Sequence, residues 1–163
     1  MPYVLRAIQT ADDPAVAHVI RTVMPELGAR GPGFAIHDPE VDAMTAAYPP
    51  PRAVYFVIEV DGVVVGGGGV GPLAGADDGT CELRKMYLMP AARGLGAGKT
   101  LLARCVDEAR ARGYRRMYLE TLTGMKTAQS LYQRFGFVRL DAPEGATGHF
   151  GCDRWYALDL TRR

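Results

Sequence analysis

Long apolar runs, clustered cysteines and an excess of one charge are absent from this sequence. No apolar stretch is long enough to span a membrane, and the N-terminus lacks the basic and apolar regions of a signal peptide. The three cysteines, Cys81, Cys105 and Cys152, are far apart and odd in number. This spacing argues against a disulfide framework and a cysteine metal site, and it favours reduced thiols in a cytoplasmic protein.

The charges are nearly balanced, so the sequence gives no basis for binding nucleic acid or a membrane surface. Lys and Arg number 19 and Asp and Glu number 18, which gives a net charge of +1. The chain has 163 residues, 48% of them hydrophobic, and this is enough for one core. Because no repeat or linker divides the sequence, we expect a single domain over residues 1–163.

Hydrophobic periodicity predicts an α/β fold with the order β-α-α-β-β-β-α-β-α-β-β and a mixed sheet. The expected strands cover residues 3–8, 53–60, 63–72, 81–88, 115–122, 137–140 and 154–160. The expected helices cover residues 13–24, 38–47, a segment that ends near 112, and 125–135. Asp61-Gly62 predicts a tight hairpin turn. Glycines 66–69 lie inside a strand, and we expect them to pack closely under a helix rather than bind a ligand.

The most informative stretch runs from Cys81 to Leu102 and has the sequence CELRKMYLMPAARGLGAGKTLL. In it, a strand-like run is followed by Pro90, a glycine-rich turn and a helix. Glycines let backbone N–H groups approach a ligand, and a helix N-terminus adds unpaired N–H groups and the positive end of a dipole. Together these features predict an anion site, most often one for phosphate.

Three phosphate-binding patterns can be compared with this turn. The dinucleotide pattern G-x-G-x-x-G fails, since its third glycine would fall on Lys99. The P-loop G-x-x-x-x-G-K-[ST] matches at its end but requires glycine where Arg93 stands. The pattern [QR]-x-x-G-x-[GA] is matched in full by Arg93, Gly96 and Gly98.

A second pattern lies downstream, where residues 128–137 have the sequence AQSLYQRFGF and match A-x-x-L-Y-x-x-x-G-F. With both patterns, the sequence from about residue 81 to residue 140 resembles the GNAT N-acetyltransferase superfamily. The resemblance implies a mostly antiparallel mixed sheet flanked by helices, and acetyl-CoA as co-substrate. It implies cofactor contacts at Arg93, Gly94, Leu95, Gly96, Ala97, Gly98, Lys99 and Thr100. The preceding strand would splay from its neighbour and offer the backbone of Met86 and Leu88 to the pantetheine arm.

The resemblance also places the catalytic groups. Glu82 stands where some family members carry a glutamate that accepts the proton of the amine. The alternative is that Glu82 only forms an ion pair with Arg84. Glu120 is a second candidate base. Tyr132 stands at the place of the general-acid tyrosine, and the alternative is a core tyrosine on an amphipathic helix. Met125 departs from the family, which often has an asparagine there.

The acceptor would lie between the early helices and the last hairpin, according to the resemblance. The residues expected to contact it are Phe34, His37, Tyr48, Glu120, His149 and Asp153. His149 is followed by Cys152 and Asp153, which could suggest a metal, but no other ligands cluster there in the sequence. We therefore expect a loop histidine and no metal.

These features lead us to expect an acetyl-CoA-dependent N-acetyltransferase in which a primary amine attacks directly in a ternary complex. No cysteine or serine adjoins an evident histidine base, so no covalent acyl-enzyme is expected. A small molecule is the expected acceptor; an amino acid, a polyamine-like amine, an antibiotic amine and a protein N-terminus all remain open, as does a homodimer. The alternatives are a catalytically silent acyl-CoA sensor or interaction domain, and a P-loop nucleotide hydrolase.

Overall fold

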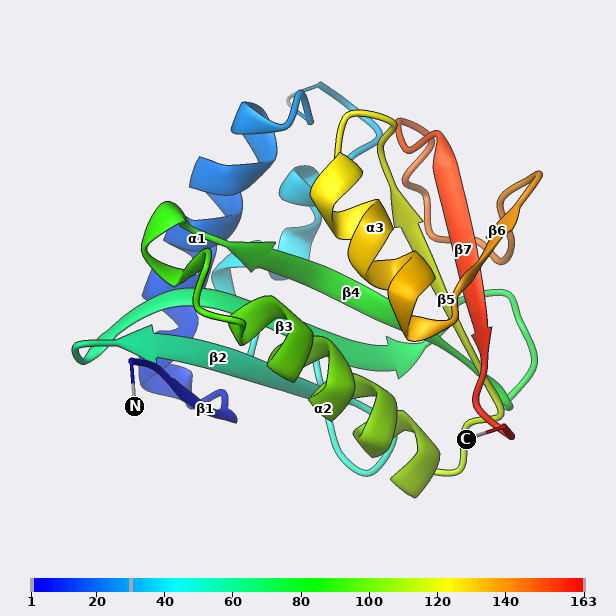
Figure 1. Ribbon diagram of the computed structural model, residues 1–163, viewed down its shortest axis with the longest axis horizontal. Coiled ribbons are helices and arrows are strands. Elements are labelled where there is room, and N and C mark those ends of the chain that lie inside the picture. Colours follow the sequence, from blue (N-terminus) through cyan, green and yellow to red (C-terminus); the bar gives the residue numbers. More distant parts are fainter. Residues whose placement is uncertain (1, 30, 163) are drawn as a thin grey trace.

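The computed structural model describes residues 2–29 and 31–162, which form one seven-stranded sheet with helices on both faces (Figure 1). The strands are β1 (Val4–Ala7), β2 (Val54–Val60), β3 (Val63–Pro72), β4 (Thr80–Leu88), β5 (Arg116–Thr121), β6 (Val138–Leu140) and β7 (Arg154–Asp159). The α-helices are α1 (Asp13–Glu26), α2 (Ala97–Ala111) and α3 (Lys126–Phe135). In the described part of the chain, none of the helices has the length and apolarity needed to cross a membrane.

The sheet is mixed and mostly antiparallel, as expected. Its strand order is β1-β2-β3-β4-β5-β7-β6, and of the pairs in this order β4 and β5 alone run parallel within the described residues. A parallel pair requires a crossover connection, and α2 provides it. This connection begins with the glycine-rich turn, so the topology brings that turn to the end of β4.

The sheet separates two hydrophobic cores. On β2, Phe56 and Ile58 pack with α2 and α3, whereas Tyr55 and Val57 pack with α1. This division follows the alternation of side chains along a strand. In Figure 1, α2 and α3 accordingly lie in front of the sheet and α1 lies behind it.

The glycine run of β3 packs closely against neighbours on both faces, as the sequence predicts. A Cβ added to Gly68 would lie 3.2 Å from Cδ2 of Leu101 on α2. A Cβ added to Gly67 would lie 2.7 Å from Cε1 of Tyr55 on the α1 face. No room is left for larger side chains, so the glycines allow the tyrosine ring and α2 to sit directly on the sheet.

The second α-helix expected at residues 38–47 is not formed. Two 3₁₀ turns, Ala35–His37 and Pro39–Asp42, stand in this region instead. The backbone N–H and the hydroxyl of Thr45 both donate to Oδ1 of Asp13, at 2.9 and 2.6 Å. The N–H of Thr45 is therefore used in a long-range bond and is not available to a helix.

β4 and β5 diverge soon after they meet. They pair only from Thr80 to Glu82 on β4, and from there β4 is bonded to β3 alone. The β3–β4 register steps from Gly67–Tyr87 to Gly69–Arg84, so Lys85 and Met86 form a bulge opposite Gly68. The divergence is the splay that the family resemblance implies.

We expect Gly67→Ala to lower the free energy of unfolding by about 1–3 kcal/mol, because the new methyl group would overlap Tyr55 and the Phe56 carbonyl. Gly31→Ala is the matched control: nothing lies within 4 Å of its added Cβ, and a change below about 0.5 kcal/mol is expected. Urea unfolding measures both. Equal midpoints for the two variants would contradict close packing of the glycine run.

Candidate active site

Three adjoining cavities cross the molecule at the splay. The helix groove, about 660 Å³, lies between the end of β4, the start of α2 and α3. The central cavity, about 40 Å³, lies between the diverging strands and shares Met86, Tyr87, Met125 and Tyr132 with the helix groove. The charged pocket, about 370 Å³, adjoins the central cavity at Lys85.

The helix groove contains most of the residues expected to hold a cofactor. It is lined by Met86, Leu88, Arg93, Gly94, Gly96, Ala97, Gly98 and Lys99. Leu95 and Thr100 are not among its lining residues. The Thr100 hydroxyl instead donates to the Gly96 carbonyl at 3.1 Å and accepts from the Tyr3 hydroxyl at 2.8 Å.

The glycine-rich turn leaves open space where a ligand would pass. Gly94 and Gly96 have left-handed backbones with φ of +77°, and no atom lies within 4 Å of a Cβ built on either. Gly96 is the residue before α2, so the first N–H groups of α2 follow it directly. The cationic side chains of Lys99, Lys126 and others line the same groove. This donor set suits the pyrophosphate of acyl-CoA.

Met125, where the family often has asparagine, lies at the junction of the helix groove and the central cavity. Its sulfur accepts a hydrogen bond from the Thr121 hydroxyl at 3.1 Å. The side chain is thus held by β5, and it presents sulfur and methyl groups where an amide would offer polar contacts.

Tyr132 lies in the core and also borders two of the cavities. Its ring packs on Phe137 and Tyr156, with centroids 5.7 and 6.1 Å away, and the residue is 6% exposed. It lines both the helix groove and the central cavity. Burial raises the pKa of its phenol, so the hydroxyl keeps its proton and serves as a donor.

Glu82 and Glu120 lie on neighbouring strands, and their surroundings shift their pKa values in opposite directions. Burial, assisted by the nearby Glu120, raises the pKa of Glu82 although Arg84 opposes the shift. Burial also acts to raise the pKa of Glu120, but hydrogen bonds from His149, Thr147 and Tyr118 outweigh it and lower that pKa. Nε of Arg84 donates to Glu82 at 3.0 Å, so the ion pair considered from the sequence is present. Glu82 is the more basic of the two carboxylates.

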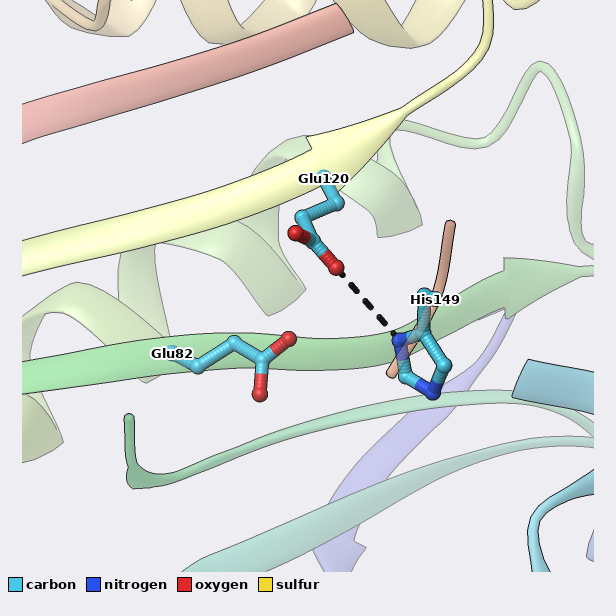
Figure 2. A group of neighbouring side chains, drawn as sticks. All are labelled: Glu82, Glu120 and His149. Carbon is cyan, nitrogen blue, oxygen red and sulfur yellow. Dashed lines mark ion pairs between the residues drawn. The ribbon is translucent and has the colours of Figure 1, made fainter. Parts of the chain in front are cut away.

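His149 lies between two carboxylates. Its Nε2 is 2.9 Å from Oδ2 of Asp38, and its Nδ1 is 3.5 Å from Oε1 of Glu120. Figure 2 shows the contact with Glu120 and the Glu82 carboxylate beside it. These bonds raise the pKa of His149 to about 9. The ligand atoms of Glu82, Glu120 and His149 lie within 4.8 Å of one another, and a metal ion bound there would have to displace a proton from His149.

Asp38 and Lys85 belong to the same network and were not identified from the sequence. The Lys85 ammonium is held by Asp38 at 2.7 Å and by Glu40, and the lysine side chain is 2% exposed. Asp38 was interpreted only as the start of a helix. In the structure, Lys85 stands out by its left-handed backbone, with a φ of +47°. The sequence has no pattern that predicts this conformation.

The expected acceptor residues divide into two groups. Phe34 and Glu120 line the central cavity, and His149 lines the charged pocket. The other three line none of the three cavities: His37 is exposed on a 3₁₀ turn, Tyr48 packs on Tyr55 in the core, and Asp153 accepts two hydrogen bonds from Thr123.

The raised pKa of His149 predicts a pH dependence of stability. Because the folded pKa lies above the ordinary value of 6.5, the stabilisation is complete below pH 6.5 and is lost as pH rises through about 9. We expect the stability advantage of the wild type over His149→Gln to shrink by about 1–3 kcal/mol between pH 6.5 and pH 9.5. Urea unfolding at both pH values measures it, with His18→Gln on the exposed face of α1 as control. An advantage independent of pH would contradict the bridging imidazolium.

Comparisons with known proteins identify the family of the chain. The family model described as the acetyltransferase (GNAT) family matches residues 22–137. The chain is 42% identical over 151 residues to the uncharacterized N-acetyltransferase YjgM of Escherichia coli, covering 92% of this chain and 90% of that one. It is 34% identical over 153 residues to an IAA acetyltransferase of Azospirillum brasilense, covering 94% of each.

Solved structures share the fold at low sequence identity. A GNAT-family acetyltransferase from Staphylococcus aureus aligns with a TM-score of 0.85 at 19% identity, covering 97% of this chain and 99% of that one. YncA of Salmonella typhimurium, solved with its cofactor acetyl-CoA, aligns with a TM-score of 0.75 at 22% identity, covering 98% and 95%. The chain belongs to the GNAT family of acetyltransferases and is an acyltransferase.

Proposed function

We propose that the protein transfers an acetyl group from acetyl-CoA to the primary amine of a small molecule, by direct attack in a ternary complex. One observation supports this proposal above all: the helix groove and the charged pocket both adjoin the central cavity. Glu120 and Tyr132 both border that cavity. Because all these residues lie around one sheet, we propose that the chain acts as a single domain.

The helix groove supplies the cofactor site in this proposal. The N–H groups at the start of α2 and the cationic Arg93 and Lys99 would hold the pyrophosphate, and Met86 and Leu88 would flank the pantetheine arm. Each helix-end charge interaction contributes about 0.3–1 kcal/mol, so binding requires several of them together. Bound there, acetyl-CoA supplies an activated acyl carbonyl.

Glu82 is the proposed proton acceptor. An alkylamine has a pKa of about 10.4, so the neutral form costs roughly 4–5 kcal/mol at pH 7. A buried carboxylate with a raised pKa is a better acceptor for that proton than an ordinary one, directly or through water. Glu120, whose pKa is lowered, would stay ionised and stabilise the ammonium form of the acceptor as it enters.

Tyr132 is proposed to donate a hydrogen bond to the departing sulfur. Its pKa is above the ordinary value of about 10, whereas that of a thiol is about 8.5, so full proton transfer to the thiolate is uphill by more than about 2 kcal/mol. A hydrogen bond to a charged acceptor contributes about 1.5–3 kcal/mol without that transfer. The tyrosine thus stabilises the thiolate, which later takes a proton from water.

The surroundings of Cys152 support direct attack. Cys152 lines the central cavity, but burial raises the pKa of its thiol to about 12. The protonated thiol is a poor nucleophile. The Cys152 thiol is therefore not activated to form an acyl-cysteine intermediate.

Replacing Gly96 tests the cofactor site. Gly96→Val should weaken acetyl-CoA binding at least about tenfold, because a β-branched residue resists the left-handed backbone and its side chain enters the groove. Gly62→Val, in the β2–β3 turn with φ of +79° and open space around it, is the control for strain alone. Calorimetric titration should show normal affinity for the control. Equal affinities for both variants would show that this turn does not hold the cofactor.

Replacing Tyr132 separates catalysis from binding. Tyr132→Phe keeps the ring packing, so acetyl-CoA affinity should hold while kcat falls about 10–100-fold, the equivalent of one charge-assisted hydrogen bond. The rate is measured as thiol release with the best amine from a panel. Unchanged kcat would make Tyr132 a packing residue. Absence of turnover with every amine, together with normal cofactor binding, would favour a catalytically silent acyl-CoA sensor.

A further inference from the structure

The charged pocket also specifies the chemistry of the acceptor. We propose that the acceptor is a small amine that carries a second positive charge, such as a linear diamine. This inference rests on the proposed function. Its basis is the set of charged groups around the pocket and the bonds that they already make.

The cationic groups of the pocket are bound to protein oxygen atoms. The Lys85 ammonium contacts Asp38 and Glu40, and the two ring nitrogens of His149 face Asp38 and Glu120. Arg84 donates through Nε to Glu82 and through Nη2 to the Pro72 carbonyl. An anionic substrate would have to break these pairs, and lost pairing of a buried charge is costly.

The carboxylates, by contrast, still have oxygen atoms that can accept hydrogen bonds. The pocket itself is lined by three carboxylates, Asp38, Glu40 and Glu82, and by three cationic side chains, and Glu120 of the adjoining central cavity adds one negative charge through its contact with His149. Within residues 2–29 and 31–162, Oε2 of Glu40 and Oε2 of Glu82 accept no hydrogen bond. The pocket therefore presents unpaired acceptor atoms, which match the N–H donors of an ammonium group.

These acceptor atoms come from two separate parts of the fold. Glu82 lies on β4, and Glu120 borders the central cavity where the acyl carbonyl would arrive. Asp38 and Glu40 lie on and beside the 3₁₀ turn Pro39–Asp42, in the wall of the charged pocket. An acceptor can place its reacting amine near Glu82 and a second ammonium near Glu40. The volume of about 370 Å³ admits a short chain of this kind.

An amino acid fits the same pocket less well. Its carboxylate would meet Asp38 or Glu40 at one end, and like charges at short range repel in a partly buried site. Few donors are left for such a carboxylate: within the described residues, Nη1 of Arg84 makes no hydrogen bond, and the Lys85 ammonium uses two of its three N–H groups on Asp38 and Glu40. A bound amino acid would therefore depend on these few donors, which lie beside the carboxylates of Glu82, Asp38 and Glu40.

Three compounds of equal length test the charge requirement on the wild-type protein. They are 1,5-diaminopentane, pentylamine and 5-aminopentanoate, which differ only in the charge of the far end. We expect kcat/KM for the diamine to exceed that of pentylamine at least tenfold and that of 5-aminopentanoate at least a hundredfold. The excess should shrink with added salt. Equal values, or a preference for 5-aminopentanoate or for an uncharged peptide N-terminus, would overturn the proposal.

Glu40→Gln tests where the second charge binds. The amide keeps the shape and an acceptor for Lys85, and the preference for diamine over pentylamine should fall at least fivefold. Asp42→Asn is the matched control, because Asp42 lies on the same turn, is 72% exposed and pairs with Arg21 away from the pocket. A preference equally reduced in both variants, or reduced in neither, would overturn the assignment to Glu40.

Binding separates this inference from the proposed function. Calorimetric titration of the three compounds into wild-type protein saturated with CoA requires no turnover. Tighter binding of the diamine without acetylation of any amine would uphold the charge requirement and defeat the enzyme assignment. Acetylation of monoamines with equal binding of all three compounds would uphold the enzyme assignment and defeat the charge requirement.

Discussion

The separation of β4 from β5 after Glu82 determines the shape of the site. Up to that residue the two strands pair, and beyond it the described residues form no β4–β5 ladder, although Nε of Arg93 donates to the Leu88 carbonyl at 2.9 Å. An unpaired edge inside a sheet is costly unless other groups compensate. Here the edge borders the central cavity, and the same backbone would meet an acyl-CoA arm. Part of the stability that continuous pairing would give is thus replaced by a binding surface.

Lys85 connects this backbone feature to the charged pocket. Its left-handed conformation costs about 1–2 kcal/mol for a residue with a Cβ. The Tyr55 hydroxyl donates to the Lys85 carbonyl at 2.8 Å, and the ammonium holds Asp38 and Glu40. The backbone of Lys85 therefore takes part in the bulge, and its side chain fixes the pocket wall. A change in the bulge would move the acceptor wall as well.

The sequence predicts the features that depend on neighbouring residues. Strand alternation, the Asp61-Gly62 turn and the glycine-rich junction before α2 are local patterns, and the structure reproduces them. Contacts between distant segments were not predicted. His149 meets Asp38 across 111 residues, and the bond from Thr45 to Asp13 spans 32. Tyr48 was expected at the acceptor but lies against Tyr55 in the core, because the β3 glycines leave space for these rings.

The two sides of the site therefore depend on different kinds of sequence information. The proposed cofactor side is built by a continuous segment, from β4 through the glycine-rich turn to α2, and a short motif predicts it. The proposed acceptor side is built by ion pairs among β4, β5, the 3₁₀ turn Pro39–Asp42 and the loop that carries His149. The bonds from His149 and Thr147 also keep Glu120 ionised, which leaves Glu82 as the more basic carboxylate. Substitutions in that loop could change both acceptor choice and base strength while the acetyl-CoA motif stays intact. Shared motifs thus establish the family, and the long-range charges must establish the acceptor.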